Sequence, residues 1–226
     1  ADFVGIIFSG RATLFRRLNS GRKARFMRII EGDLFNAHDP GDPLQPVRMV
    51  RAATPLVALT LTLEEFQRLV VGPLGAAAVS CYVHKHLFLQ RASATCAAWP
   101  PAAVAQFAEL AGIASHGAGT KILVQDHDVG DIHVLYEGRA SALRNGRRVG
   151  KIKPGEFFGE ISLLQNSSAT ADVETIDDVR CLAVNRVEFI RFISRNHHVA
   201  LRLERLCSER LGHPIFPLRG QSFDVR

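Results

Sequence analysis

The residue types that can do chemistry are concentrated in one short stretch. It begins Phe158-Gly159-Glu160-Ile161-Ser162 and, after a polar loop, ends Ala169-Thr170-Ala171. A glycine at the turn into a short helix allows the backbone N–H groups of residues 160–162 to point at an anion. The hydroxyl group of Thr170 is a further hydrogen-bond donor in this stretch. The stretch therefore predicts an anion-binding pocket.

The sequence does not favour an enzyme. Ser162 and His127 are the nearest candidates for a nucleophile and a base, but no Gly-x-Ser-x-Gly turn and no carboxylate pair accompanies them. The nine histidines have no Cys or carboxylate at the spacing of a zinc site, so we expect no metal and no cofactor. The cysteines have no C-x-x-C spacing and are expected to be buried thiols in a reducing, cytoplasmic setting: Cys81, Cys96, Cys181 and Cys207.

The chain contains an internal repeat. The matched segments are 6–13 with 134–141, 30–35 with 153–158, and 61–66 with 184–189. The first pair has an offset of 128 residues and the other two have an offset of 123, so the register changes only once. A register held this well predicts two copies of one fold.

Each copy reads as short strands followed by helix. Glycine, Asp and Asn turns separate the strand-like runs, which is typical of a barrel or sandwich. Helices are expected at 74–92, at 100–111 and after the N-cap pairs Thr62-x-x-Glu65 and Asn185-x-x-Glu188. After Asn185 the apolar residues Val187, Ile190 and Ile193 recur at helical spacing, and a break near Asn196 predicts two helices at an angle.

The expected fold class is α+β, with two tandem antiparallel β-barrels of jelly-roll type, each followed by helices. The expected units are 1–73, a connecting helix and linker at 74–98, a second domain at 99–212 and a tail at 213–226. The first copy starts at the strand before Gly10, so we expect it to lack its amino-terminal portion, and the chain to be a fragment.

The net charge of +6 comes largely from two basic hairpins. Their basic residues are Arg16, Arg17, Arg22, Lys23, Arg25 and Arg28 in the first, and Arg144, Arg147, Arg148, Lys151 and Lys153 in the second. We interpret both as solvated tips that protect sheet edges, so we do not expect nucleic acid as a partner. The apolar runs are too short for a membrane span.

The second copy resembles the cyclic-nucleotide-binding domain family, which occurs in kinase regulatory subunits, gated channels and bacterial activators. The residues that carry the resemblance are Asp128-x-Gly130-Asp131, Gly138, Pro154-Gly155-Glu156-x-Phe158 and Phe158-Gly159-Glu160-Ile161-Ser162-Leu163-Leu164. The resemblance covers about 99–211 and, more weakly, 1–89. It implies that residues 158–162 and 169–171 contact the ligand and that Glu160 accepts a ribose hydroxyl.

The sequence departs from the family at the position of its phosphate-binding arginine, which is Ala169 here. Loss of a charge-assisted contact to phosphate weakens binding by about 10- to 100-fold or more. The resemblance extends to family members with altered phosphate pockets that accept uncharged nucleosides, so the ligand is expected to be a cyclic nucleotide or a nucleoside.

The first copy departs further. Asn36 and Ala37 stand at the positions of Gly159 and Glu160, and Pro46 and Val47 at those of Ala169 and Thr170. A turn-forming run, His38-Asp39-Pro40-Gly41-Asp42-Pro43, follows Ala37. We expect this copy not to bind ligand. The alternative is an unusual pocket that uses Arg48, which lies close by in the sequence.

The resemblance implies a regulatory module that senses its ligand and switches a protein partner, such as a kinase. The alternative is an interaction scaffold whose pockets have lost their ligand. A transcription factor is less favoured, because only about fifteen residues follow the last helix, too few for a helix-turn-helix.

Overall fold

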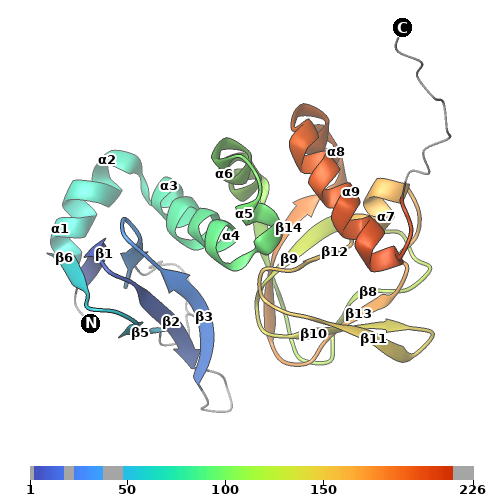
Figure 1. The fold of residues 1–226 in the computed structure, drawn as a ribbon, viewed down its shortest axis with the longest axis horizontal. Helices are drawn as coiled ribbons and strands as arrows, with labels where there is room; N and C mark the ends of the chain where they lie inside the picture. Colours follow the sequence, from blue (N-terminus) through green and yellow to red (C-terminus); the bar gives the residue numbers. More distant parts are fainter. Residues whose placement is uncertain (1–2, 18–22, 38–47, 216–226) are drawn as a thin grey trace, which may run out of the picture.

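A computed structural model describes residues 3–17, 23–37 and 48–215 (Figure 1). The first repeat comprises β1 (Phe3–Ser9), β2 (Ala12–Arg17), β3 (Lys23–Ile29), β4 (Leu34–Phe35), β5 (Arg48–Ala52) and β6 (Val57–Thr62). Helical segments follow: α1 (Leu63–Phe66), η1 (Gln67–Val71), α2 (Gly72–Leu74), α3 (Ala76–Ser80), η2 (Cys81–His86), α4 (Leu87–Ala92), α5 (Ala94–Ala97) and α6 (Pro101–Leu110). The segments η1 and η2 are π-helical.

The second repeat comprises β7 (Gly112–His116), β8 (Lys121–Leu123), β9 (Asp131–Glu137), β10 (Ala140–Arg144), β11 (Arg147–Ile152), β12 (Phe157–Phe158), α7 (Glu160–Gln165), β13 (Asp172–Thr175), β14 (Val179–Asn185), α8 (Arg186–Arg195) and α9 (His197–Leu211). In Figure 1 the two sets of strands lie at opposite sides of the molecule, with α3 to α6 between them.

The sheet topology confirms the internal repeat. Antiparallel sheets have the strand orders β4-β1-β6 and β3-β2-β5 in the first repeat, and β12-β9-β14-β7 and β11-β10-β13-β8 in the second. A shift of 128 residues carries β1 onto β9, and a shift of 123 carries β4 onto β12. The α+β fold with tandem jelly-roll-type units is therefore confirmed. In the described part of the first repeat, no strand occupies the places of β7 and β8.

The expected helices form, with differences in detail. Helix 74–92 is interrupted at Gly75, whose φ is 82°, and the helical runs on either side of it are bent by 103°. The capping box at Thr62 is complete, because its hydroxyl accepts from the N–H of Glu65 and the Glu65 carboxylate accepts from the N–H of Thr62. Asn185 caps α8 through the N–H of Val187, one residue earlier than predicted.

The predicted inner face of α8 is wrong. Val187 is 62% exposed and Ile190 is 40% exposed, whereas Phe189 and Phe192 are buried. Phe192 lies 5.6 Å from Phe107 of α6, measured between ring centroids. Two phenyl rings remove more apolar area from water than the smaller aliphatic side chains, so the helix turns its aromatic side inward.

One hydrophobic core runs through both repeats. At its centre Phe88 of α4 packs against Tyr136 of β9 at 4.5 Å and against Phe26 of β3 at 5.6 Å. Close by, Gly155 has φ of 92°, and a Cβ there would lie 2.1 Å from the carbonyl oxygen of Ala92. The connecting helix is therefore a shared part of both cores.

Equivalent positions of the two repeats differ in how far they are buried. Tyr136 is 1% exposed under α4, while its counterpart Phe8 is 65% exposed. Gly155 touches the connecting helix, while its counterpart Gly32 has open space around it. The described part of the chain thus covers this face only in the second repeat.

The second basic hairpin forms as predicted around Asn145-Gly146, whose φ angles of 51° and 72° are those of a type I′ turn. The first hairpin pairs β2 with β3, but its tip falls outside the described residues, as do 38–47. Among the described helices, no single one is long and apolar enough to cross a membrane; only the bent pair Leu63–Leu74 and Ala76–Ala92 passes that test together.

All four cysteines are free thiols, as predicted. Cys96, Cys181 and Cys207 are buried, and Cys81 is partly buried. Burial raises the pKa of Cys96 and of Cys181 to about 12, so both thiols are neutral at physiological pH.

Candidate functional site

The eight residues predicted to contact a ligand line one cavity of about 400 Å³ in the second repeat. They are Phe158, Gly159, Glu160, Ile161, Ser162, Ala169, Thr170 and Ala171. The opposite wall comes from β10 and β11 and includes Ala142, Arg144, Val149, Gly150, Lys151 and Ile152. Glu156 and Arg210 also reach the cavity.

The turn at Gly159 sets the direction of α7. Gly159 has φ of 84°, and a Cβ there would lie 3.0 Å from the carbonyl oxygen of Asp131. Both the backbone angle and the close approach require glycine. The turn lets α7 begin at Glu160 without a side-chain cap, and the amides of its first turn have no acceptor within the helix.

The loop after α7 returns along residues 126–127. The N–H of Ala169 donates to the carbonyl of His127 at 2.8 Å, and the N–H of Asp126 donates to the carbonyl of Ala169 at 2.9 Å. These bonds fix Ala169 in the cavity wall, where it is 3% exposed. A methyl group therefore stands at the position predicted from the resemblance to have lost its cation.

Glu160 is 1% exposed and is paired with a cation. Its Oε1 accepts from the guanidinium of Arg210 at 2.6 Å, and the same guanidinium nitrogen donates to the carbonyl of Phe157 at 2.6 Å. Arg210 belongs to the last turn of α9, so this ion pair ties the C-terminal helix to the cavity. Burial, and next the Glu160 carboxylate, raise the pKa of the neighbouring Cys207 thiol.

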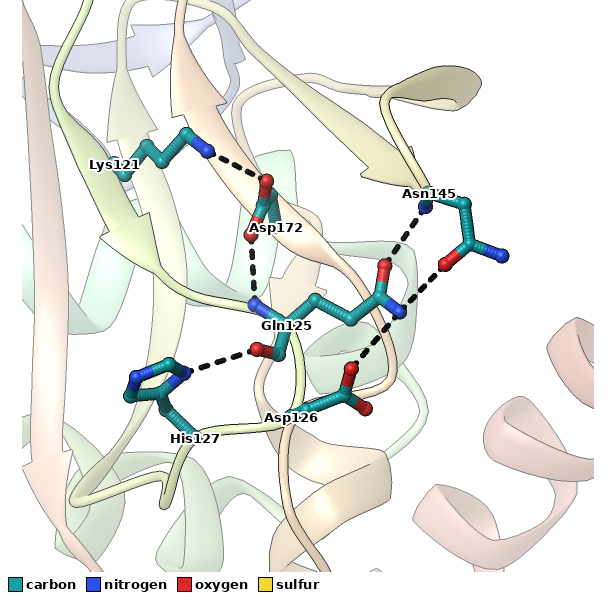
Figure 2. Close-up of polar contacts among 6 residues, drawn as sticks. All are labelled: Lys121, Gln125, Asp126, His127, Asn145 and Asp172. Atoms are coloured by element: carbon teal, nitrogen blue, oxygen red, sulfur yellow. Dashed lines mark hydrogen bonds and ion pairs between the residues drawn. The ribbon is translucent and has the colours of Figure 1, made fainter.

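A polar network joins the loop before β9 to the β10–β11 turn and to β13 (Figure 2). The side chain of Gln125 accepts from the N–H of Asn145 at 2.8 Å and donates to the Asn145 side chain at 2.9 Å. The N–H of Gln125 donates to Asp172 at 2.7 Å, and Lys121 donates to the other oxygen of Asp172 at 2.8 Å. The hydrogen bond from Lys121 lowers the pKa of Asp172, and the bond to Asp172 raises the pKa of Lys121.

Phe158 lines the cavity and is supported by a buried histidine. The rings of Phe158 and His133 are stacked at 4.8 Å with an angle of 5° between their planes. Burial lowers the pKa of His133 to about 4, so this histidine is neutral at pH 7.

In the first repeat, the turn is kept but the carboxylate is not. Asn36 has φ of 58°, a left-handed backbone like that of Gly159, and Ala37 is buried at the position of Glu160. The predicted turn at 38–43 and the positions Pro46 and Val47 lie outside the described residues, and Arg48 lies in β5.

Sequence reasoning missed Arg210 and Arg144 as parts of the cavity. Arg210 is fifty residues from Glu160, and only the direction of α9 brings the two together. Arg144 was assigned to a solvated hairpin, although it follows Ala140 and Ala142 on the inward-facing side of β10. That alternation was the available signal.

Among the described residues, no group of three or more His, Cys, Asp and Glu side chains could hold a metal ion.

Part of the second repeat matches a known domain family. Residues 115–196 match the model of the cyclic nucleotide-binding domain. The predicted resemblance is confirmed. The matched cyclic nucleotide-binding domain contains the whole stretch from Phe158 to Ala171.

Solved structures show the same fold over nearly the whole chain. The regulatory domain of Toxoplasma gondii PKA, solved with cAMP, is 17% identical with a TM-score of 0.53, over 94% of this chain and 78% of that one. The regulatory subunit of a cAMP-independent protein kinase A from Trypanosoma brucei is 18% identical with a TM-score of 0.50, over 96% and 74%. A triple mutant of a Trypanosoma brucei subunit of this kind, bound to cAMP in the A site, is 19% identical with a TM-score of 0.50, over 93% and 78%.

Proposed function

We propose that the second repeat binds a cyclic nucleotide or a nucleoside and that the chain is a non-catalytic regulatory module. The observation that carries the proposal is the cavity that gathers Gly159, Glu160, Ser162 and Thr170 inside the matched domain. Its volume of about 400 Å³ suits a ligand the size of a nucleotide.

Each part of such a ligand has a partner in the cavity. The amides at the start of α7 and the hydroxyl of Thr170 suit a phosphate or another acceptor group. Glu160 suits a ribose hydroxyl. Because Arg210 already donates to this carboxylate, the hydroxyl would share the carboxylate with Arg210 or displace it. Val149, Ile152 and Val173 provide an apolar surface for a base.

The proposed partner is a protein such as a kinase or another effector. In Figure 1, α9 lies beside α7, and Arg210 of α9 holds Glu160 directly. A ligand that binds one arrangement of this helix better than the other shifts the balance between them. The four free thiols support a cytoplasmic, intracellular setting.

A second candidate function is an interaction scaffold without ligand. It is favoured by the Arg210–Glu160 pair, which occupies the carboxylate proposed to accept the ribose, together with the methyl group of Ala169 at the phosphate position. In this role the first repeat and the helices of the second would present surfaces to partners constitutively.

Calorimetric titration with cyclic AMP, cyclic GMP, adenosine, inosine and guanosine tests the proposal. At least one ligand is expected to bind, and Glu160→Ala is expected to weaken it by about 1.5 to 3 kcal/mol, the range for a charged hydrogen bond. Glu188→Ala, an exposed carboxylate outside the cavity, is the matched control and should leave binding unchanged. No binding of any of the five ligands would favour the scaffold.

A further inference from the structure

The cavity contains a cation that the family motif does not supply. Arg144 stands at the end of β10, and Lys151 stands on the neighbouring strand β11. Both line the cavity together with Ala169 and Thr170. The wall facing the motif residues is therefore positively charged, although the motif itself carries Ala169.

Arg144 is held next to the vacated position. Its Nε donates to the carbonyl oxygen of Thr170 at 3.2 Å, and Thr170 directly follows Ala169. Within the described residues, the two terminal nitrogens of Arg144 make no hydrogen bond or ion pair. By contrast, Arg210 is neutralised by Glu160. Arg144 thus brings free donors to the phosphate side of the cavity.

The direction of Arg144 follows from the sheet. Side chains two residues apart on a strand share a face, and Ala140 and Ala142 lie on the inward-facing side of β10. Arg144 continues this row. Leu143, which lies between the last two of these positions, points to the other face.

The network around Gln125 holds Asn145, the residue that follows this arginine (Figure 2). Asn145 follows Arg144 directly, and the side chain of Gln125 holds both its N–H and its amide oxygen. The N–H of Gln125 is in turn bonded to Asp172 of β13. The tip of the hairpin is therefore fixed to the loop that precedes β9, and its first residue cannot drift far from Thr170.

We propose that Arg144 replaces the missing cation at Ala169, so that the pocket selects a ligand with a phosphate group over the corresponding neutral nucleoside. This inference rests on the proposed function, because it assigns the charge of the ligand in the same cavity. The free nitrogens of the guanidinium would donate hydrogen bonds to two phosphate oxygens.

Lys151 is the other cation on the β10–β11 wall of the cavity and is a less suitable candidate. It has no bond to the loop at 169–171, whereas Arg144 does. A lysine ammonium also presents a point charge, while the planar guanidinium matches two phosphate oxygens at once. Glu156 lies in the same wall, but its carboxylate accepts from the N–H of Lys153.

The experiment compares each cyclic nucleotide with its own nucleoside by calorimetry, in the chain as it exists and in single variants. Cyclic AMP is paired with adenosine and cyclic GMP with guanosine, at low and at high salt. We expect the cyclic nucleotide to bind about 10- to 100-fold more tightly than its nucleoside, with the advantage shrinking as salt rises. Inorganic phosphate alone is expected to bind far more weakly.

Arg144→Gln is expected to remove this advantage and leave nucleoside affinity unchanged, which also shows that the variant is folded. Arg148→Gln, in the same hairpin but outside the cavity, is the charge-matched control and should keep the advantage. Gln125→Ala tests the positioning role: it should reduce nucleotide affinity without changing nucleoside affinity, which a general loss of structure would not do.

Several results would overturn the inference. Nucleoside binding with no preference for the nucleotide refutes it and leaves the proposed function intact. If Arg144→Gln weakens nucleotide and nucleoside binding equally, Arg144 is not the phosphate-binding cation. If Lys151→Gln removes the preference for the nucleotide instead, Lys151 is that cation. If inorganic phosphate binds as tightly as the nucleotide, Arg144 belongs to an anion site that is independent of the nucleoside pocket. If no nucleoside or nucleotide binds at all, the proposed function falls and this inference falls with it.

Discussion

Replacing Arg210 by Gln tests whether the ion pair with Glu160 holds α9 to the cavity. The variant leaves a carboxylate that is 1% exposed without its cation. Removing one partner of a buried pair costs about 3 to 5 kcal/mol. The Arg210 side chain is 34% exposed, however, so water recovers part of this, and we expect a loss of about 2 kcal/mol.

The assay is urea unfolding at pH 7 of four proteins: the parent chain, Arg210→Gln, Glu160→Gln and the double variant. A neutral amide at 160 no longer needs a cation, so the double variant should be less destabilised than the two single variants summed, with a coupling energy of about 1 to 2 kcal/mol. Arg205→Gln, an exposed arginine on the same helix, should cost less than about 0.5 kcal/mol. Additive losses, or an Arg210→Gln variant as stable as this control, would refute the reasoning.

Three further perturbations address the contact of Gly155 with the connecting helix, the buried histidine and the phosphate position. Gly155→Ala should cost more than about 3 kcal/mol in unfolding free energy, because its Cβ meets the Ala92 carbonyl, whereas Gly119→Ala, with φ of 75° in open space, should cost only about 1 kcal/mol; similar costs would refute the clash. His133 binds its proton more weakly folded (pKa about 4) than unfolded (6.5), so stability should fall by about 2 kcal/mol from pH 7 to pH 5, and by less in His133→Phe; equal slopes would argue against this histidine. Ala169→Arg, made in the Arg144→Gln variant, should tighten cyclic nucleotide binding by about 10-fold or more at low salt relative to Arg144→Gln alone, and a flat response at every ionic strength would mean that this side chain does not face the ligand.

Much of the fold could be predicted because the sequence contains two copies of it. The repeat gave two independent readings of each strand, and turn residues such as Gly159 and Asn145 have strict backbone requirements that are local in sequence. The motif residues 158–171 come together for the same reason. They belong to the end of β12, one turn, one short helix and the loop that follows it, so their proximity needs little tertiary information.

What the sequence did not reveal depends on contacts across the fold. The aliphatic spacing of Val187 and Ile190 gave a plausible helix face, but the rings of Trp99 and Phe107 select the face that carries Phe192. Arg210 meets Glu160 only because α9 runs back over α7. Basic residues also carry little positional signal, because a lysine or arginine at a hairpin is as common on a solvated tip as in a pocket wall.

The aromatic joint of Phe26, Phe88 and Tyr136 limits how freely these repeats can be exchanged. A cut in residues 93–98 would leave Phe26 and Phe88 on one fragment and Tyr136 on the other, so both fragments would present rings that are now dry. Exposed apolar surface of this kind promotes aggregation. The two copies are therefore no longer modular. Recombination can move them as a pair, whereas the second copy alone would need a new aromatic helix in place of α4.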